Sequence, residues 1–202
     1  MPLEMRIEYQ EWPYKQVFKF ARETRQFSPL FVVHLSDGEY LGRGECGIQS
    51  LKKETPSLVA AELTNIASRI NEFGSREELN RMVPARSWRN AVDCAFWDLE
   101  CKRVHARVWD LAGLHCPDKF DVDLTIGINA TEKMRLEAVA AVSRGYHLLK
   151  IKSDAHSVLE KVGTISRAVP DAQLIVDANE AMTFDDLRRL APELVRLGVM
   201  LV

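Results

Sequence analysis

Hydrophobic and polar positions in the first half of the chain follow a period of two and then a helical period. Alternation predicts three strands, at residues 5–12, 30–35 and 40–46. We expect Pro13 to end the first strand, and Ser36-Asp37-Gly38 predicts a hairpin turn between the other two. In the third strand, a close approach by another backbone is indicated by Gly42, Gly44 and Gly47. Helical spacing follows, so we expect an α+β domain over residues 1–117, a three-stranded antiparallel sheet with helices.

From residue 120 onward, strands and helices alternate with short connections. The predicted strands are residues 122–128, 147–152, 173–178 and 199–202, and the predicted helices are residues 131–144, 156–169 and 183–197. Such βα units build a parallel sheet, either open or closed into a barrel. No glycine-rich phosphate-binding loop follows any of these strands, which disfavours a nucleotide-binding sheet. We expect this second domain to cover residues 118–202.

The composition is that of an ordinary globular protein and narrows the classes of partner. The chain has 202 residues, of which 47% are apolar, and a net charge of −2. This balance argues against nucleic acid or an anionic membrane as a partner. No apolar run approaches the roughly 20 residues that span a bilayer, and the N-terminus has no signal-peptide core. The four cysteines form no CxxC pair, so we expect reduced thiols in a cytoplasmic protein.

Two lysines stand on one predicted strand of the parallel sheet. Lys150 and Lys152 are two residues apart, so both side chains project from the same face. Strands of a parallel sheet are normally continuous apolar runs, because helices cover both faces. Two ammonium groups on one face therefore need compensation, unless both point into solvent at the strand end.

The next predicted strand ends in a carboxylate. Asp177 follows three apolar residues, and Asn179 lies on the same face. In parallel α/β folds, functional sites are built at the carboxyl ends of strands, although an Asp at this place can equally cap a loop or helix. A carboxylate and an amide oxygen are hard ligands that suit Mg²⁺ and not zinc. Together the two strands predict a site that combines Lys150 and Lys152 with Asp177.

The motifs on these strands resemble the enolase superfamily, in its muconate-lactonizing branch, and within it most nearly the L-Ala-D/L-Glu dipeptide epimerases. The resemblance covers nearly the whole chain. It rests on Glu11–Pro13, Phe20–Arg22, Gly42–Cys46, Arg89–Leu99, Leu148–Lys152 and Ala168–Glu180. It implies a capping domain followed by a TIM-type (β/α) barrel. It also implies an enzyme that uses Mg²⁺ to acidify the α-proton of a small carboxylate substrate such as a dipeptide, and that passes through an enediolate.

The resemblance assigns a role to each candidate residue. Lys152 would be the acid/base on one face of the α-carbon, and Lys150 would raise the positive potential that stabilises the enediolate. Asp177 would be the first metal ligand, with Asn179 supporting it. Loops Phe20–Pro29 and Ile48–Glu54 would set specificity.

Two further residues are candidates for substrate binding. The resemblance implies that Arg25 binds an acidic substrate side chain, and a solvated loop charge is the alternative. Thr125 ends the first strand of the parallel sheet and is a candidate hydrogen-bonding group for the substrate. The alternative for Thr125 is a strand-end hydroxyl that bonds only within the protein.

A (β/α)8 barrel takes about 250 residues, so the resemblance implies that the chain covers about three and a half βα units of one. The remaining metal ligands and an opposite-face lysine are expected beyond Val202, and the 202-residue chain alone is expected to be inactive. A partial barrel leaves an open sheet edge, which predicts a homo-oligomer formed through that edge.

Two alternative functions stay open. The first is another reaction of the same branch: cycloisomerisation, racemisation of N-acylamino acids, or dehydration. The second is a catalytically inactive half-barrel that serves as a structural or binding module.

Overall fold

The computed structural model describes residues 2–20, 23–116 and 118–202, which form two compact units. Unit 1 comprises the described residues of Met1–Pro13 and Phe27–Pro117, and unit 2 those of Tyr14–Gln26 and Asp118–Val202. Within these described ranges, no helix is long and apolar enough to cross a membrane.

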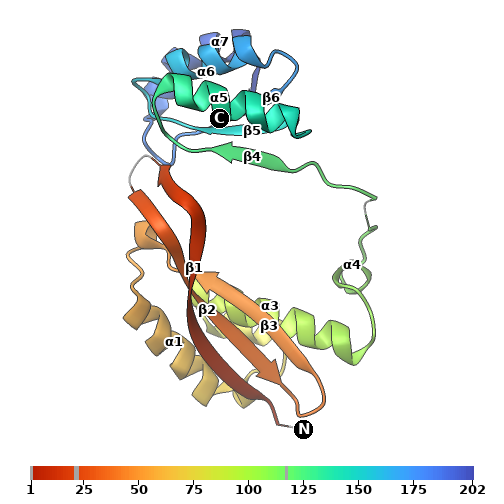
Figure 1. Cartoon of the computed structure of the whole chain (residues 1–202). Coiled ribbons are helices and arrows are strands. Elements are labelled where there is room, and N and C mark those ends of the chain that lie inside the picture. Colours follow the sequence, from red (N-terminus) through yellow and green to blue (C-terminus); the bar gives the residue numbers. More distant parts are fainter. Residues whose placement is uncertain (1, 21–22, 117) are drawn as a thin grey trace. The chain divides into compact units, whose positions relative to one another are not determined.

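A three-stranded sheet runs through the first part of the chain, in the order β1-β2-β3 (Figure 1). Its strands are β1 (Glu4–Phe20), β2 (Glu23–Ser36) and β3 (Leu41–Gly47). Strands β2 and β3 pair antiparallel, from Leu30 opposite Gly47 to Ser36 opposite Leu41. The helical segments that follow are η1 (Ser50–Lys52), α1 (Pro56–Ser68), η2 (Ile70–Glu72), α2 (Arg76–Met82), α3 (Ser87–Arg103) and α4 (Val108–Leu111). The predicted antiparallel sheet with helices is confirmed.

Two predicted boundaries in this sheet are wrong. Strand β1 does not end at Pro13 but continues to Phe20, and β2 begins at Glu23 instead of residue 30. The reason is the place of β1 at the edge of the sheet, where a proline without an N–H need not interrupt pairing. The predicted loop Phe20–Pro29 is therefore mostly strand. Residues 21 and 22, which belong to this loop and to the Phe20–Arg22 motif, lie outside the described residues.

Helix α3 packs directly on the backbone of β3. A β-carbon at Gly42 would lie 2.1 Å from the carbonyl oxygen of Ala95, and one at Gly44 would lie 2.0 Å from that of Ala91. No side chain fits between the two backbones. The predicted close approach is thus confirmed at these two positions and wrong at Gly47, where a β-carbon would meet nothing within 4 Å.

In unit 2, strands alternate with helices in a four-stranded parallel sheet of order β4-β5-β6-β7. The elements are β4 (Asp123–Ile126), α5 (Thr131–Ser143), β5 (Leu148–Lys152), α6 (Val158–Ala168), β6 (Gln173–Asp177), α7 (Phe184–Arg196) and β7 (Val199–Leu201). Helices α5, α6 and α7 lie over one face of this sheet (Figure 1). The predicted βα alternation of a partial barrel is confirmed.

Every second residue of the central strands is buried beneath these helices. Leu149 and Ile151 of β5, and Leu174 and Val176 of β6, belong to the core of unit 2. Because successive side chains of a strand point to opposite faces, the residues between them project from the other face. That face carries Lys150, Lys152 and Asp177.

The glycine contact generates a stability prediction. Gly44→Ala is expected to lower the free energy of unfolding of unit 1 by about 1–3 kcal/mol, because the methyl group overlaps the α3 backbone. All four tryptophans precede residue 118, so their fluorescence during urea denaturation reports on unit 1. Gly47→Ala is the matched control and is expected to change stability little. Equal effects of the two substitutions would contradict the proposed packing constraint.

Candidate functional site

Strands β5 and β6 place the predicted site residues side by side at their carboxyl ends. Lys152 is the register partner of Asp177, and Lys150 is the partner of Ile175. On the other side of β5, Thr125 of β4 is the register partner of Lys150. Paired residues of neighbouring strands face the same way, so these side chains share one face of the sheet.

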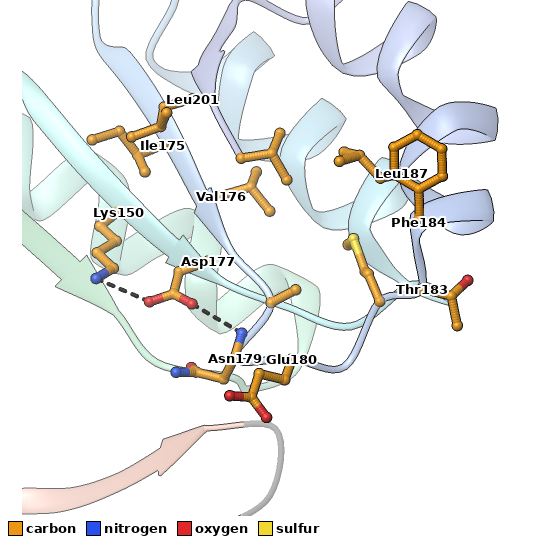
Figure 2. Close-up of a pocket in the computed structure, with 13 residues that line it drawn as sticks. Lys150, Ile175, Val176, Asp177, Asn179, Glu180, Thr183, Phe184, Leu187 and Leu201 are labelled. Carbon is orange, nitrogen blue, oxygen red and sulfur yellow. Dashed lines mark hydrogen bonds and ion pairs between the residues drawn. The ribbon is translucent and has the colours of Figure 1, made fainter. Parts of the chain in front are cut away.

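One carboxylate oxygen accepts hydrogen bonds from both lysines. The Lys152 Nζ lies 2.6 Å from Asp177 Oδ2, and the Lys150 Nζ lies 2.9 Å from the same oxygen. Figure 2 shows the Lys150–Asp177 contact and the backbone N–H of Asn179, which donates to Asp177 Oδ1 at 2.9 Å. The alternative in which both lysines point freely into solvent is wrong, since Lys152 is only 8% exposed.

The lysines determine the protonation of Asp177. Burial of this carboxyl group raises its pKa, but the hydrogen bonds from Lys152, Lys150 and the Asn179 N–H outweigh that effect and hold the pKa at about 2. Asp177 is therefore ionised at neutral pH. The cluster contains two ammonium groups and one carboxylate, so it has an excess of positive charge available to an anionic substrate.

The chain turns sharply just beyond Asp177. Asn179 and Glu180 have φ values of 47° and 64°, in the left-handed region that non-glycine residues seldom occupy. Within the described part of the chain, the buried Asn179 Oδ1 accepts no hydrogen bond. This strained turn borders a cavity of about 480 Å³ that Lys150 and Asp177 also line (Figure 2).

The sequence did not identify the apolar wall of this cavity. Ile175, Met182 and Leu187 line it together with the polar cluster. Of these three residues, only Ile175 could have been predicted from the sequence to line the cavity. It lies two residues before Asp177 and therefore projects from the same face of β6. Met182 and Leu187 come from the loop after β6 and from α7, and their approach depends on how that loop turns.

The oxygen donors at the site suit Mg²⁺ in kind but not in number. Asp177 offers a carboxylate, and Asn179 Oδ1 is an unpartnered oxygen close to it in the chain. Among the described residues, however, no group of three or more His, Cys, Asp or Glu side chains could hold a metal ion. Since Mg²⁺ requires an octahedral set of oxygens, these residues could supply part of a site but not all of it.

Of the remaining candidates, Thr125 shares the face of the cluster, and Arg25 and Ile48–Glu54 belong to other segments of the chain. The Thr125 hydroxyl donates to Asp123 Oδ2 at 3.3 Å, so it has a partner within the protein. Arg25 lies inside β2 and not in a loop, and its role in substrate binding stays a prediction. The segment Ile48–Glu54 belongs to unit 1, where Glu54 is buried.

The chain is similar in sequence to proteins of a known family. Residues 3–113 match the family model described as the mandelate racemase / muconate lactonizing enzyme, N-terminal domain. The L-Ala-D/L-Glu epimerase of Escherichia coli K12 is 35% identical over 191 residues, which are 95% of this chain and 60% of that protein.

Solved structures agree with the fold. An L-Ala-D/L-Glu epimerase structure aligns with a TM-score of 0.87 at 32% identity, over 98% of this chain and 61% of that one. A dipeptide epimerase from Enterococcus faecalis V583, complexed with Mg and the dipeptide L-Leu-L-Tyr, aligns with a TM-score of 0.88 at 22% identity, over 98% of this chain and 60% of that one. The chain thus spans about three fifths of the length of these relatives.

The ion cluster predicts an acid titration. Because the pKa of Asp177 is about 2 in the folded chain and 3.8 ordinarily, the cluster stabilises unit 2 above about pH 4. This contribution, at most about 2 kcal/mol, is lost as the pH falls from 4 to 2. Carboxyl ¹³C NMR of the metal-free chain is expected to place the Asp177 midpoint near pH 2.

Replacement of Lys152 tests whether the lysines are the cause of the low pKa of Asp177. Lys152→Met is expected to move the Asp177 midpoint upward toward its ordinary value, because the shorter of the two ion pairs of Asp177 is removed. Lys133→Met, at an exposed position of α5, is the matched control and is expected to leave the midpoint unchanged. If the Asp177 carboxyl group of the unsubstituted chain titrates with a midpoint near pH 3.8, the two lysines do not lower its pKa.

Proposed function

The chain belongs to the mandelate racemase / muconate lactonizing enzyme family of the enolase superfamily, and on that basis we propose that it carries part of the active site of a dipeptide epimerase. The observation that supports this proposal is the cluster of Lys150, Lys152 and Asp177 on one face of a parallel sheet. In an epimerase, the site removes the α-proton of a substrate carboxylate and returns a proton on the opposite face.

Lys152 is the residue that we propose as acid/base. Its Nζ lies at the carboxyl end of β5 and is held by Asp177 at 2.6 Å, so its position is fixed before substrate binds. To act as the base, Lys152 first releases its ammonium proton to solvent; the amine then takes the proton from the α-carbon, and the resulting ammonium group returns it in the reverse reaction. The inverted product needs a second proton donor on the other face, which we expect outside the present sequence.

Lys150 stabilises the charge that forms when the proton leaves. The electron pair left on the α-carbon spreads onto the substrate carboxylate, which gains negative charge. A fixed ammonium group beside that carboxylate stabilises the transition state more than the ground state. Lys150 lies 2.9 Å from Asp177 and lines the cavity, which suits this role.

Asp177 would be one of the ligands of a divalent cation. Bound Mg²⁺ would supply Lewis-acid polarisation of the substrate carboxylate. The described residues do not complete its coordination shell, so further ligands have to come from outside the present sequence for this part of the proposal to hold.

The substrate that we propose is a dipeptide such as L-Ala-L-Glu. The support is the similarity to the Escherichia coli enzyme along almost the whole chain. Arg25 is the proposed partner of the acidic side chain, since a guanidinium group pairs with carboxylates in a bidentate manner.

Exchange of the substrate α-hydrogen in D₂O tests the proposal. With Mg²⁺ and L-Ala-L-Glu, we expect no exchange by the 202-residue chain alone, because the residues that the structure describes supply too few metal ligands. A form extended by the remaining strands is expected to exchange deuterium at the α-carbon and to epimerise the dipeptide. Failure of the extended form on a panel of dipeptides would contradict the proposed reaction. Exchange with N-acyl amino acids only would favour an N-acylamino-acid racemase.

The role of Lys152 has a separate prediction. In the extended form, Lys152→Ala is expected to lower exchange for the epimer whose α-proton faces Lys152 by a factor of about 10² or more, because general acid–base catalysis contributes that much. Lys133→Ala is the control and is expected to leave the rate unchanged. The exchange rate of each stereoisomer is measured by ¹H NMR. Undiminished exchange in Lys152→Ala would overturn the role that we assign to Lys152.

A further inference from the structure

A buried carboxylate in unit 1 has no role in the proposed chemistry. Glu54, at the end of the segment after β3, is only 5% exposed. A buried charge is costly unless hydrogen bonds compensate it. Its partners therefore indicate what its burial achieves.

Three donors from two separate parts of the chain converge on this carboxylate. The Ser87 hydroxyl donates to Glu54 Oε2 at 2.6 Å, and the Gln49 N–H donates to the same oxygen at 3.0 Å. The Ser87 N–H donates to the other oxygen, Oε1, at 3.3 Å. Glu54 thus links its own segment to a residue 33 positions further along.

Glu54 performs the capping that α3 lacks locally. Arg86 occupies the N-cap position of α3 but makes no side-chain capping hydrogen bond. The first N–H groups of a helix have no partner within it, and a negative charge there also interacts favourably with the helix dipole. By accepting from Ser87, Glu54 satisfies one of these groups from a distant segment.

The segment itself is closed by its own backbone. The Gln49 carbonyl accepts from Lys52 N at 2.9 Å and from Glu54 N at 3.2 Å. Lys53 is left-handed, with a φ of 59°, which completes the tight turn. A guanidinium nitrogen of Arg86 also donates to the Lys52 carbonyl at 3.4 Å. Two attachments to the start of α3 therefore hold this closed segment: the hydrogen bond from Arg86 to Lys52 and the pair of hydrogen bonds from Ser87 to Glu54.

We infer that Glu54 is a latch that holds residues 47–53 against the start of α3 and thereby fixes one wall of a polar cleft. The cleft has a volume of about 650 Å³. Gly47, Gln49 and Lys52 form one side of it, and residues at the start of α3, including Asn90, form another. The inference does not rest on the proposed reaction, since every contact that supports it lies within unit 1.

Donors on both oxygens make the latch specific for a carboxylate. In Glu54→Gln, an amide –NH₂ has to face either the two donors at Oε2 or the Ser87 N–H at Oε1, because an amide has only one acceptor oxygen. The substitution keeps the size of the side chain and removes hydrogen bonds on one side. It therefore weakens the latch without creating a cavity.

Hydrogen–deuterium exchange of the 202-residue chain, followed by mass spectrometry, tests the inference. Glu54→Gln is expected to increase exchange about tenfold or more in peptides covering residues 47–55 and the first turn of α3, with later turns of α3 unchanged. Glu77→Gln, at a glutamate whose side chain is 71% exposed, is the matched control. Unchanged exchange at residues 47–55 in Glu54→Gln would overturn the latch.

Serine variants keep the test decisive if Glu54→Gln unfolds unit 1. Ser87→Ala removes only the hydroxyl donor and is expected to increase exchange at residues 47–55 several-fold. Ser87→Thr keeps a hydroxyl and is expected to restore protection, which a general loss of stability would not predict. The latch is wrong if Ser87→Ala leaves this segment protected, or if the alanine and threonine variants exchange alike.

Discussion

The candidate site depends on the burial of alternate residues of β5 and β6 beneath the helices of unit 2. Leu149 and Ile151 are fully buried. Because successive side chains of a strand point to opposite faces, their burial determines the face from which the neighbouring side chains project. A shift of one residue would bury two lysines in the helix layer and expose the core. The hydrophobic pattern thus fixes Lys150 and Lys152 on the open face without any contribution from the polar groups themselves.

Asp177 makes that arrangement stable in electrostatic terms. Two ammonium groups on one strand repel each other, and one of them is almost fully buried. A carboxylate on the neighbouring strand, in register with Lys152, offsets this cost with two charge-assisted hydrogen bonds. The same three groups leave net positive charge where we propose that the substrate carboxylate binds. Asp177 therefore serves both requirements: it stabilises the two lysines in the fold, and it leaves the positive charge that the proposed reaction needs.

Sequence reasoning succeeded where placement depends on local periodicity and failed where it depends on distant elements. Lys152 and Asp177 could be predicted because a period of two and a strand end determine their face. The passage of β1 through Pro13 could not, because a proline is tolerated only once the strand is known to lie at an edge. Gly44 and Gly47 have the same sequence signal, and only the path of α3 distinguishes them. The partnership of Glu54 with a residue 33 positions away has no local signal at all.

The sharing of Asp177 Oδ2 also limits what this part of the protein can hold. A divalent cation at that oxygen competes with two ammonium groups, and both of them repel it. A single carboxylate does not outweigh two positive charges, so a cation is retained only when further carboxylates surround it. The described residues, by contrast, form a compensated ion cluster with no such group of ligands. In the site that we propose, the cluster would therefore be the cationic side, and a metal ion at Asp177 would need further carboxylates from other strands.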